Sequence, residues 1–178
     1  MKGAVRVELI AEISDIDLGL MSSNLPDQVH IRKAARAIIL NESNQIALLY
    51  VSEKNYHKLP GGGVEANETW SEALQREVKE EVGATIEMIA NLGSIIEHRG
   101  RHHLIQQSCC YLARAVEMSH TPSFTKEEQA NGFQLKWMNY DQAVSLIKHD
   151  KPKDYVGQFI QKRDFLFLQK VKMYCKGM

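Results

Sequence analysis

Apolar residues in this chain gather in short runs separated by polar or glycine-rich segments, a pattern that predicts strands with helices between them. Residues 35–40 and 46–51 are apolar and rich in β-branched side chains, and the polar segment 41–45 between them predicts a hairpin. Because both runs are almost continuously apolar, we expect these strands to be buried on both faces. Four further strands are predicted at residues 4–18, 86–96, 106–116 and 132–138.

A helix is predicted over residues 70–82 because the sequence carries signals for both of its ends. Thr69 and Glu72 fit a capping box, in which each side chain satisfies a backbone N–H of the other residue. Gly83 supplies the C-terminal stop. Two further helices are predicted at residues 141–149 and 153–175.

Helices interleaved with strands by short connections predict a layered α/β domain. We expect a single domain over residues 1–178, with an N-terminal extension (1–30), a core (31–149) and a C-terminal helix (150–178). The extension and the terminal helix could cover the core or pair two protomers as a homodimer. Hydrophobic periodicity does not separate these alternatives.

The composition is that of an ordinary soluble domain and limits the classes of function. The 178 residues include 22 Lys and Arg against 22 Asp and Glu, a net charge of zero, and 44% are hydrophobic. Zero net charge argues against a surface that binds nucleic acid or an anionic membrane. No apolar run approaches the roughly 18 residues of a membrane-spanning helix, and residues 1–8 lack a signal-peptide core, so we expect a cytoplasmic protein.

A glycine-rich loop directly precedes the helix predicted over 70–82. The glycines at 61–63 exclude regular structure and allow unusual backbone angles. On the helix, at about 100° per residue, Glu77, Glu80 and Glu81 fall within one arc of about 100° beside the apolar stripe. Like charges so close repel each other unless they take up protons or bind a cation. An isolated cluster of this kind would be a solvated acidic face, but next to the glycine loop it predicts a divalent metal site.

The ligand type narrows the choice of metal. Oxygen donors, with no Cys or His in the helix, suit Mg²⁺ or Mn²⁺ and disfavour Zn²⁺. A bare backbone carbonyl or amide of the loop could approach that ion or a phosphate group, which a side chain at Gly61 or Gly62 would obstruct.

The spacing of these residues resembles the Nudix box, G-x5-E-x7-R-E-U-x-E-E-x-G-U, in which U is a bulky aliphatic residue. Gly62 is followed after five residues by Glu68 and after seven more by the segment 76–84, with the sequence REVKEEVGA. Every fixed position matches, and the one soft departure is Ala84, where a larger aliphatic residue is usual. A match with this many constrained positions is specific.

The resemblance implies a Nudix fold, an α/β/α sandwich around a mixed sheet, and a hydrolase that cleaves a nucleoside diphosphate linked to another group, X. The metal ligands that it implies are the carboxylates of Glu77, Glu80 and Glu81 and the carbonyl of Gly61. Arg76 and Glu68 would orient them through charge-assisted bonds. Bound metal ions neutralise the diphosphate, lower the pKa of a bound water and orient it for attack on phosphorus.

A carboxylate must accept the proton of the attacking water, and family members differ in which one does so. The candidates here are Glu77 and Glu81 of the box, or Glu127 and Glu128 on a later loop, with Glu97 behind them. For each of the last three, an ordinary surface glutamate is the favoured alternative, because acidic residues in loops are normally solvated.

Two segments could contact the substrate. Arg99 and Arg101, in the cationic segment 97–103, could hold a phosphate group through bidentate contacts, or the segment is an exposed hairpin turn around Gly100. Tyr56 offers a ring for stacking on a nucleobase, or it lies at the loop rim without such a role. The downstream proline frequent in ADP-ribose pyrophosphatases and the tyrosine of dinucleoside polyphosphate hydrolases are both absent from the segment after the box.

The zero net charge conceals two charged segments of opposite sign. Residues 65–81 carry six acids against Arg76 and Lys79, whereas residues 148–178 carry eight bases against three acids. We therefore expect a polyanionic small molecule, a nucleotide or nucleoside diphosphate derivative, to enter the acidic site only together with a divalent metal.

Two other functions stay open on the same fold. One is a non-catalytic domain that senses a nucleotide, although such a domain can dispense with the carboxylates that this chain keeps. The other is an isomerase of prenyl diphosphates, for which Cys109 or Cys110 would have to face the site. The three cysteines include no C-x-x-C pair, which favours reduced, packed thiols over disulfides or a zinc site.

Overall fold

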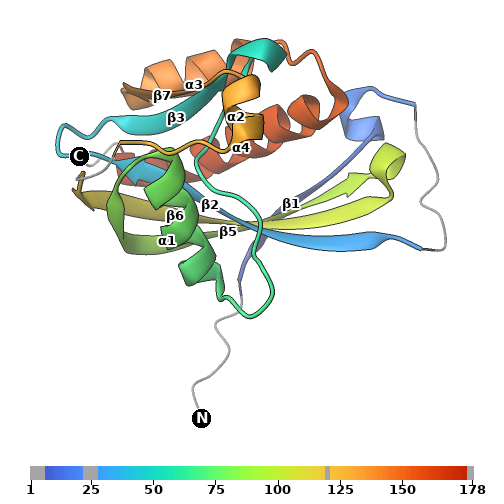
Figure 1. Cartoon of the computed structure of the whole chain (residues 1–178). Helices are drawn as coiled ribbons and strands as arrows, with labels where there is room; N and C mark the ends of the chain where they lie inside the picture. Colours follow the sequence, from blue (N-terminus) through green and yellow to red (C-terminus); the bar gives the residue numbers. More distant parts are fainter. Residues whose placement is uncertain (1–6, 22–27, 119–120, 176–178) are drawn as a thin grey trace.

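The computed structural model describes residues 7–21, 28–118 and 121–175. Within these residues, strands form one mixed sheet in the order β1-β5-β6-β2-β3-β4, with β7 paired to β3 (Figure 1). The strands are β1 (Leu9–Ser14), β2 (His30–Leu40), β3 (Ile46–Val51), β4 (Tyr56–Lys58), β5 (Thr85–Arg99), β6 (Leu104–Glu117) and β7 (Phe133–Met138). The helices are α1 (Trp70–Glu81), α2 (Lys126–Ala130), α3 (Tyr140–His149) and α4 (Tyr155–Cys175).

The strand pairing makes the sheet mixed. β1 runs parallel to β5 and β2 runs parallel to β6, whereas the other paired strands are antiparallel. The hairpin predicted around residues 41–45 is confirmed by the antiparallel pairing of Leu40 with Ile46. Residues 35–40 and 46–51 are almost wholly buried, as their continuous apolar character predicts, whereas residues 30–33 at the start of β2 are exposed.

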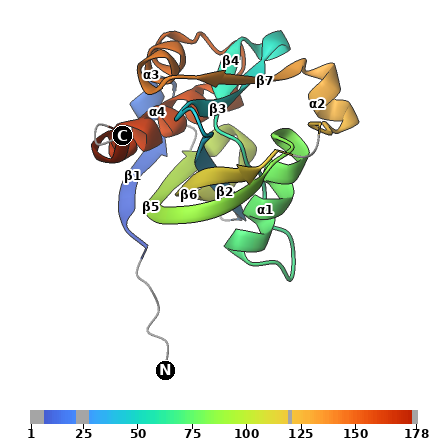
Figure 2. The ribbon, with the colours of Figure 1, turned by 90° about the vertical axis from the view of Figure 1, so that its left-hand side faces the viewer.

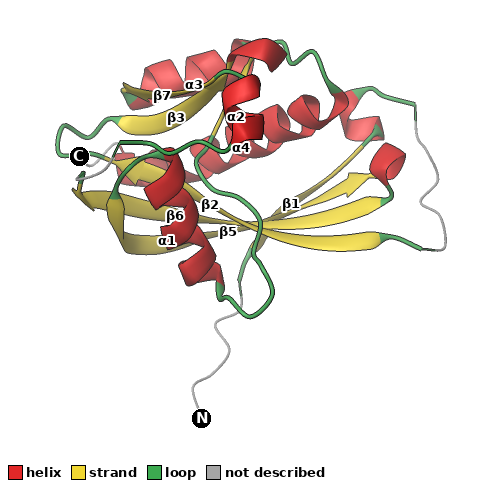
Figure 3. Cartoon of the chain, in the orientation of Figure 1, coloured by secondary structure: helices red, strands yellow, loops and turns green. Residues whose placement is uncertain are grey.

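Helices cover both faces of the sheet, as Figures 2 and 3 show. α1 packs Leu74 and Val78 against the inward residues of β2 and β6, in one apolar cluster. On the other face, α3 and α4 contribute Ile147, Phe159 and Phe167 to the larger cluster. The predicted α/β layered architecture is therefore confirmed, and the sandwich holds α1 on the face opposite to α4.

The ends of α1 follow the predicted signals. The Thr69 side chain accepts the backbone N–H of Glu72, and the Glu72 carboxylate accepts the backbone N–H of Thr69, so the capping box is complete. Gly83 has a φ of 72°, the left-handed conformation in which glycine is least strained. Local sequence therefore fixes where this helix begins and ends.

The structure differs from the predicted elements in several places. β4 and α2 were absent from the pattern, because segments of three and five residues are too short to show periodicity. The strands β2, β5 and β6 are longer than the apolar runs that predicted them. Their ends carry polar side chains, which an apolar pattern does not detect. Of the strand predicted at residues 4–18, β1 covers Leu9–Ser14, and residues 4–6 lie outside the described residues.

Two further sequence expectations concern membrane-spanning helices and the cysteines. No described helix is both long and apolar enough to cross a membrane. Cys109 and Cys110 are free, buried thiols, as predicted, and burial raises the pKa of Cys109 to about 11. The side chain of Cys175 lies outside the described residues.

Candidate active site

Backbone pairing with β2 fixes the glycine loop after β4. The N–H of Ala35 donates to the Gly62 carbonyl at 2.9 Å, and the N–H of Ala37 donates to the Pro60 carbonyl at 3.1 Å. Gly61 has a φ of 124°, and a Cβ there would lie 2.1 Å from the Ala35 carbonyl oxygen. Only glycine tolerates both the backbone angle and the close contact.

The next glycine brings the loop onto the carboxylates of α1. A Cβ at Gly62 would lie 2.1 Å from Oε1 of Glu77, so the Glu77 carboxylate occupies the space that a side chain would take. The loop backbone therefore lies directly against the Glu77 carboxylate. This contact joins loop and helix into one unit.

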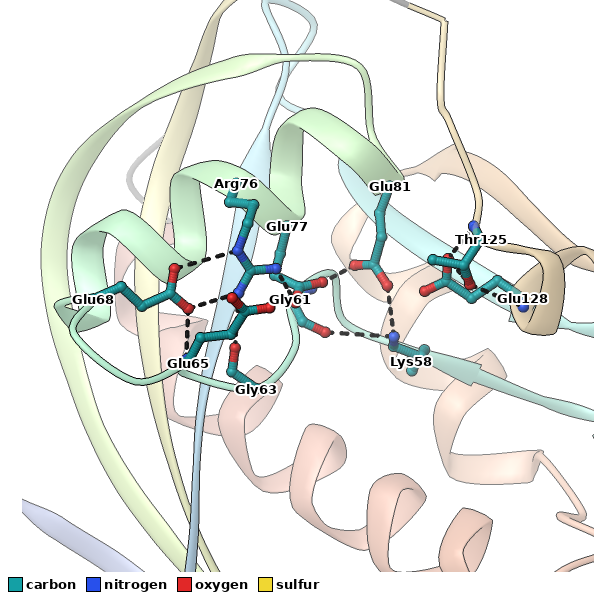
Figure 4. Close-up of polar contacts among 10 residues, drawn as sticks. All are labelled: Lys58, Gly61, Gly63, Glu65, Glu68, Arg76, Glu77, Glu81, Thr125 and Glu128. Carbon is teal, nitrogen blue, oxygen red and sulfur yellow. Dashed lines mark hydrogen bonds and ion pairs between the residues drawn. The ribbon is translucent and has the colours of Figure 1, made fainter.

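Arg76 holds this unit together (Figure 4). Its guanidinium donates to the Glu68 carboxylate at 2.7 and 3.2 Å, to Glu77 Oε1 at 2.7 Å and to the Gly63 carbonyl at 2.9 Å. The hydrogen bond to Glu68 is the main reason that the pKa of Arg76 is raised. Arg76 and Glu68 therefore lie where orienting residues should, between the loop and the glutamates.

Glu81 is buried and bonded on both carboxylate oxygens. Oε1 accepts the Lys58 ammonium at 2.7 Å, and Oε2 accepts the Gly61 N–H at 2.6 Å. Burial raises the pKa of Glu81, and the ion pair with Lys58 offsets that effect only in part. The ammonium also lies 3.5 Å from the Gly61 carbonyl oxygen.

Lys58 lies in the candidate site, although the sequence did not predict it there. Its ammonium stands between Glu81 and the carbonyl of Gly61, two of the atoms that the sequence assigned to a metal. A lysine beside a glycine loop gives no signal of its own. Only the contact between β4 and the end of α1, 23 residues later in the chain, reveals its role.

Glu80 and the segment before α2 lie beside the same site. Burial raises the pKa of Glu80, and the charges of Glu77 and Glu128 add to the increase. The backbone carbonyl of Glu80 accepts the N–H of Ser123 at 2.7 Å, which fastens the segment after residue 120 to α1. The structure therefore brings Glu128 close to the box glutamates.

The later pair of glutamates lies on a helix, so the expected placement on a loop is wrong. Glu128 completes a capping box at the start of α2, where its Oε2 accepts the N–H and the hydroxyl of Thr125 at 2.8 and 2.9 Å. Oε1 of Glu128 has no hydrogen bond among the described residues. Glu127 is exposed on the same turn.

Glu97 is not a surface glutamate but a buried one. Its carboxylate lies 2.8 Å from Arg99 and 3.3 Å from Arg163. Burial favours its neutral form, but the guanidinium groups of Arg163 and Arg99 outweigh burial and lower the pKa of Glu97. A carboxylate held in this way is a weak proton acceptor.

The three residues proposed for substrate contacts differ in accessibility. Arg99 is buried in β5, whereas Arg101 is exposed, with its guanidinium 4.9 Å from the Tyr155 ring centre. The placement of Tyr56 at the loop rim is wrong, because it pairs with Val51 in β4 and is 4% exposed. Burial raises the pKa of Tyr56 to about 12 and leaves no open ring face for stacking.

The donor chemistry of the site suits a divalent cation, but the carboxylates are engaged by the protein itself. Glu77 is bonded to Arg76, and Glu81 is bonded to Lys58. In residues 7–21, 28–118 and 121–175, no three Asp, Glu, His or Cys side chains are grouped to hold a metal ion. The residues fit such an ion through their oxygen donors and through the close approach of Gly62 to Glu77. An ion placed between Glu81 and the Gly61 carbonyl would take the position of the Lys58 ammonium.

Known proteins share this sequence pattern. The family model described as NUDIX domain matches residues 30–158. The chain is 23% identical over 156 residues to Nudix hydrolase 13, mitochondrial, of Arabidopsis thaliana, covering 83% of this chain and 76% of that protein. It is 27% identical over 115 residues to the RNA pyrophosphohydrolase of Halorhodospira halophila (strain DSM 244 / SL1), covering 58% of this chain and 64% of that protein.

Solved structures share the fold at low sequence identity. A NUDIX hydrolase from Nitrosomonas europaea matches with a TM-score of 0.58 and 14% identity, covering 83% of this chain and 90% of that one. An ADP-ribose pyrophosphatase from Streptococcus suis 89-1591 matches with a TM-score of 0.51 and 19% identity, covering 79% and 92%. With a complete box built around Arg76 and a family model that spans most of its length, the chain belongs to the Nudix family.

Proposed function

We propose that this protein is a Mg²⁺-dependent pyrophosphohydrolase that cleaves a nucleotide or a nucleoside diphosphate derivative. The observation that carries the proposal is the assembled box, in which Arg76 joins Glu68, Glu77 and the Gly63 carbonyl. Nudix hydrolases generally use a divalent metal and act on small nucleotide derivatives. The oxygen donors here suit Mg²⁺ or Mn²⁺.

The residues of the chain have distinct roles in this proposal. Glu77, Glu80 and Glu81, with the Gly61 carbonyl, would hold the metal. When bound, the metal supplies charge neutralisation of the diphosphate and an activated water. Arg76 and Glu68 keep the loop and the glutamates in place, because their bonds span both. These contacts support a rigid site, as positioning of reacting groups requires.

A carboxylate outside the metal set could accept the proton of the attacking water. Glu128 is favoured over Glu127, because the charge of Glu128 acts on Glu80. Glu97 is disfavoured, because both of its oxygens are bonded to buried partners. A carboxylate of the box, Glu77 or Glu81, is the alternative acceptor.

A substrate panel tests the proposal. Phosphate or nucleoside monophosphate release is measured for nucleoside diphosphate sugars, ADP-ribose, dinucleoside polyphosphates and nucleoside triphosphates, with Mg²⁺, with Mn²⁺ and with EDTA. We expect turnover of at least one member that EDTA abolishes. Glu80→Gln should lose activity, whereas Glu87→Gln, at an exposed position on β5, should keep it. Metal-independent turnover, or none at all, would refute the proposal.

The panel also separates a nucleotide sensor from a hydrolase, and the burial of Cys110 bears on the isomerase. A nucleotide sensor would bind a panel member without hydrolysing it. An isomerase would need an accessible cysteine, but Cys110 packs within the larger apolar cluster and burial raises its pKa well above the usual range. The structure thus offers the isomerase no support from Cys110.

A further inference from the structure

A second group of buried charges lies on the opposite side of the glycine loop from the box. We define it as the arginine cluster, formed by Arg36 on β2, Glu97 and Arg99 on β5, and Arg163 and Asp164 on α4. Arg36 is 6% exposed, Arg99 is 4% exposed, and Glu97, Arg163 and Asp164 are wholly buried.

Strand register places these residues on one face of the sheet. Arg32 pairs with Gln106 of β6, and Gln106 pairs with Glu97 of β5, so the three side chains point to the same side. Arg36 follows Arg32 by four residues and Arg99 follows Glu97 by two, which keeps both on that side. α4 covers this face and brings Arg163, whose guanidinium lies 3.3 Å from Glu97.

The arginine cluster directly adjoins the proposed active site. A Cβ on Gly61 would lie 3.0 Å from the Cα of Arg36, so Arg36 lies under the glycine loop. Asp164 accepts the backbone N–H of Leu59 at 2.8 Å and the Arg163 guanidinium at 2.7 Å. The same loop therefore has Glu81 on one side and the arginine cluster on the other.

The arginine cluster has more cations than the protein neutralises. Three guanidinium groups face two carboxylates, and Glu97 and Asp164 are both bonded to Arg163. Arg36 makes no hydrogen bond or ion pair among the described residues, and its Nε and Nη1 are fully buried. Nε of Arg99 and Nη2 of Arg163 are also buried without a partner. Burial lowers the pKa of Arg36 to about 10.

An unpaired buried guanidinium is costly, so its presence calls for a partner outside the protein. A water molecule would satisfy one N–H group but leave the charge unbalanced. An anionic oxygen would satisfy both, and guanidinium forks match the geometry of phosphate oxygens. We propose that the arginine cluster is a phosphate subsite, in which Arg36 contacts a phosphate group of the substrate while the box holds the metal.

The identity of this anion rests on the proposed function, and the test therefore uses a readout that needs neither hydrolysis nor metal. Binding of inorganic pyrophosphate and of inorganic phosphate is measured in EDTA at fixed ionic strength, by calorimetry and by ³¹P NMR titration. Because the arginine cluster, unlike the acidic box, has an excess of positive charge, we expect the metal-free wild-type protein to bind pyrophosphate there, and Arg36→Met to bind it at least tenfold more weakly. Arg114→Met removes an arginine of β6 near Asn41, remote from the glycine loop, and should bind like the wild type.

Thermal unfolding separates a ligand-binding arginine from a structural one. If Arg36 serves a ligand, Arg36→Met removes an unpaired buried charge, and the Tm of the ligand-free protein should rise by about 2–4 °C. Pyrophosphate should raise the Tm of the wild type but not that of the variant. A structural Arg36 would give the opposite sign, a lower Tm without ligand.

Arg36→Lys provides the measurement if Arg36→Met does not fold. It keeps the positive charge and loses the planar guanidinium, so we expect it to bind pyrophosphate more weakly than the wild type but still measurably. Equal binding by wild type and the Arg36 variants, or no binding by the wild type, would overturn the subsite. Hydrolysis of the substrate panel is scored separately, so that a failure of the enzyme function does not register as a failure of the subsite.

Discussion

The glycine loop adjoins two groups of charged residues that are built in opposite ways: the box cluster is only partly buried, and the arginine cluster is buried. In the box cluster, formed by Lys58, Glu68, Arg76, Glu77, Glu80 and Glu81, carboxylates outnumber cations, and both cations are bonded. In the arginine cluster, guanidinium groups outnumber carboxylates, and several N–H groups have no partner among the described residues. One group has an excess of negative charge and the other an excess of positive charge, as the proposed binding of a metal-bound diphosphate requires.

The largest effect should come from removing the buried carboxylate of the box cluster. Glu81→Gln should lower kcat/KM at least about 1,000-fold, since metal stabilisation is worth several kcal/mol. The free energy of unfolding should fall by about 3–5 kcal/mol, because the Lys58 ammonium loses its partner. Steady-state kinetics and urea denaturation measure the two losses.

A double variant tells the two losses apart. Lys58→Met combined with Glu81→Gln removes both charges, so stability should return towards that of wild type while activity stays lost. If activity returned with stability, Glu81 would be a structural residue and the metal assignment would be wrong.

Glu97→Gln should destabilise the arginine cluster. Arg99 and Arg163 then lose their shared countercharge, and we expect the free energy of unfolding to fall by about 3 kcal/mol, measured by urea denaturation. Arg36→Met should shift stability in the opposite direction. Equal signs for these two variants would contradict the excess of positive charge that distinguishes this cluster.

Lys58→Met should raise the affinity of the box cluster for a divalent metal. The ammonium no longer competes for Glu81 and the Gly61 carbonyl, so the affinity for Mn²⁺ should rise about tenfold, which corresponds to about 1.4 kcal/mol. Electron paramagnetic resonance of free Mn²⁺ gives the affinity directly. Lys79→Met, at an exposed position of α1, is the matched control and should bind like wild type. An unchanged affinity in Lys58→Met would show that the ion does not share the position of the ammonium.

The smallest effect concerns the pH dependence of Glu80. Burial and the charge of Glu77 raise its folded pKa above 4.5, so the folded state binds the proton more tightly than the unfolded state. Lowering the pH through that window therefore stabilises the wild type relative to Glu80→Gln. At pH 7.5 the metal-free variant should be more stable by about 0.2–0.5 kcal/mol, and the difference should vanish below pH 4.5. Urea denaturation at both pH values measures it, and a difference that grew on acidification would contradict the raised pKa.

Local sequence predicted the elements whose signals lie within a few residues. Thr69, Glu72 and Gly83 gave the ends of α1, and the continuous apolar runs gave β2 and β3. The box residues were found because their spacing lies on one loop and one helix. These features depend on neighbours in the chain, which is the information that periodicity and capping rules use.

Contacts between distant segments could not be predicted in this way. Lys58 contacts Glu81 only because β4 lies beside the end of α1, and the charge of Arg163 acts on Arg36 only because α4 covers the sheet. Tyr56 illustrates the same limit, since its burial follows from β4 and from the packing of Ile160 on α4. Charged residues carry no periodic signal, so sequence patterns treat each as a surface residue until the topology places it.

The bond between Leu59 and Asp164 has a consequence for protein synthesis. The glycine loop is translated in the first half of the chain. The Asp164 carboxylate, which accepts a hydrogen bond from the Leu59 N–H, comes 105 residues after Leu59, on α4. The ribosome must have passed residue 164, and α4 must have packed, before the loop has its full set of contacts. A nascent chain would therefore complete the contacts of this loop only when α4 docks.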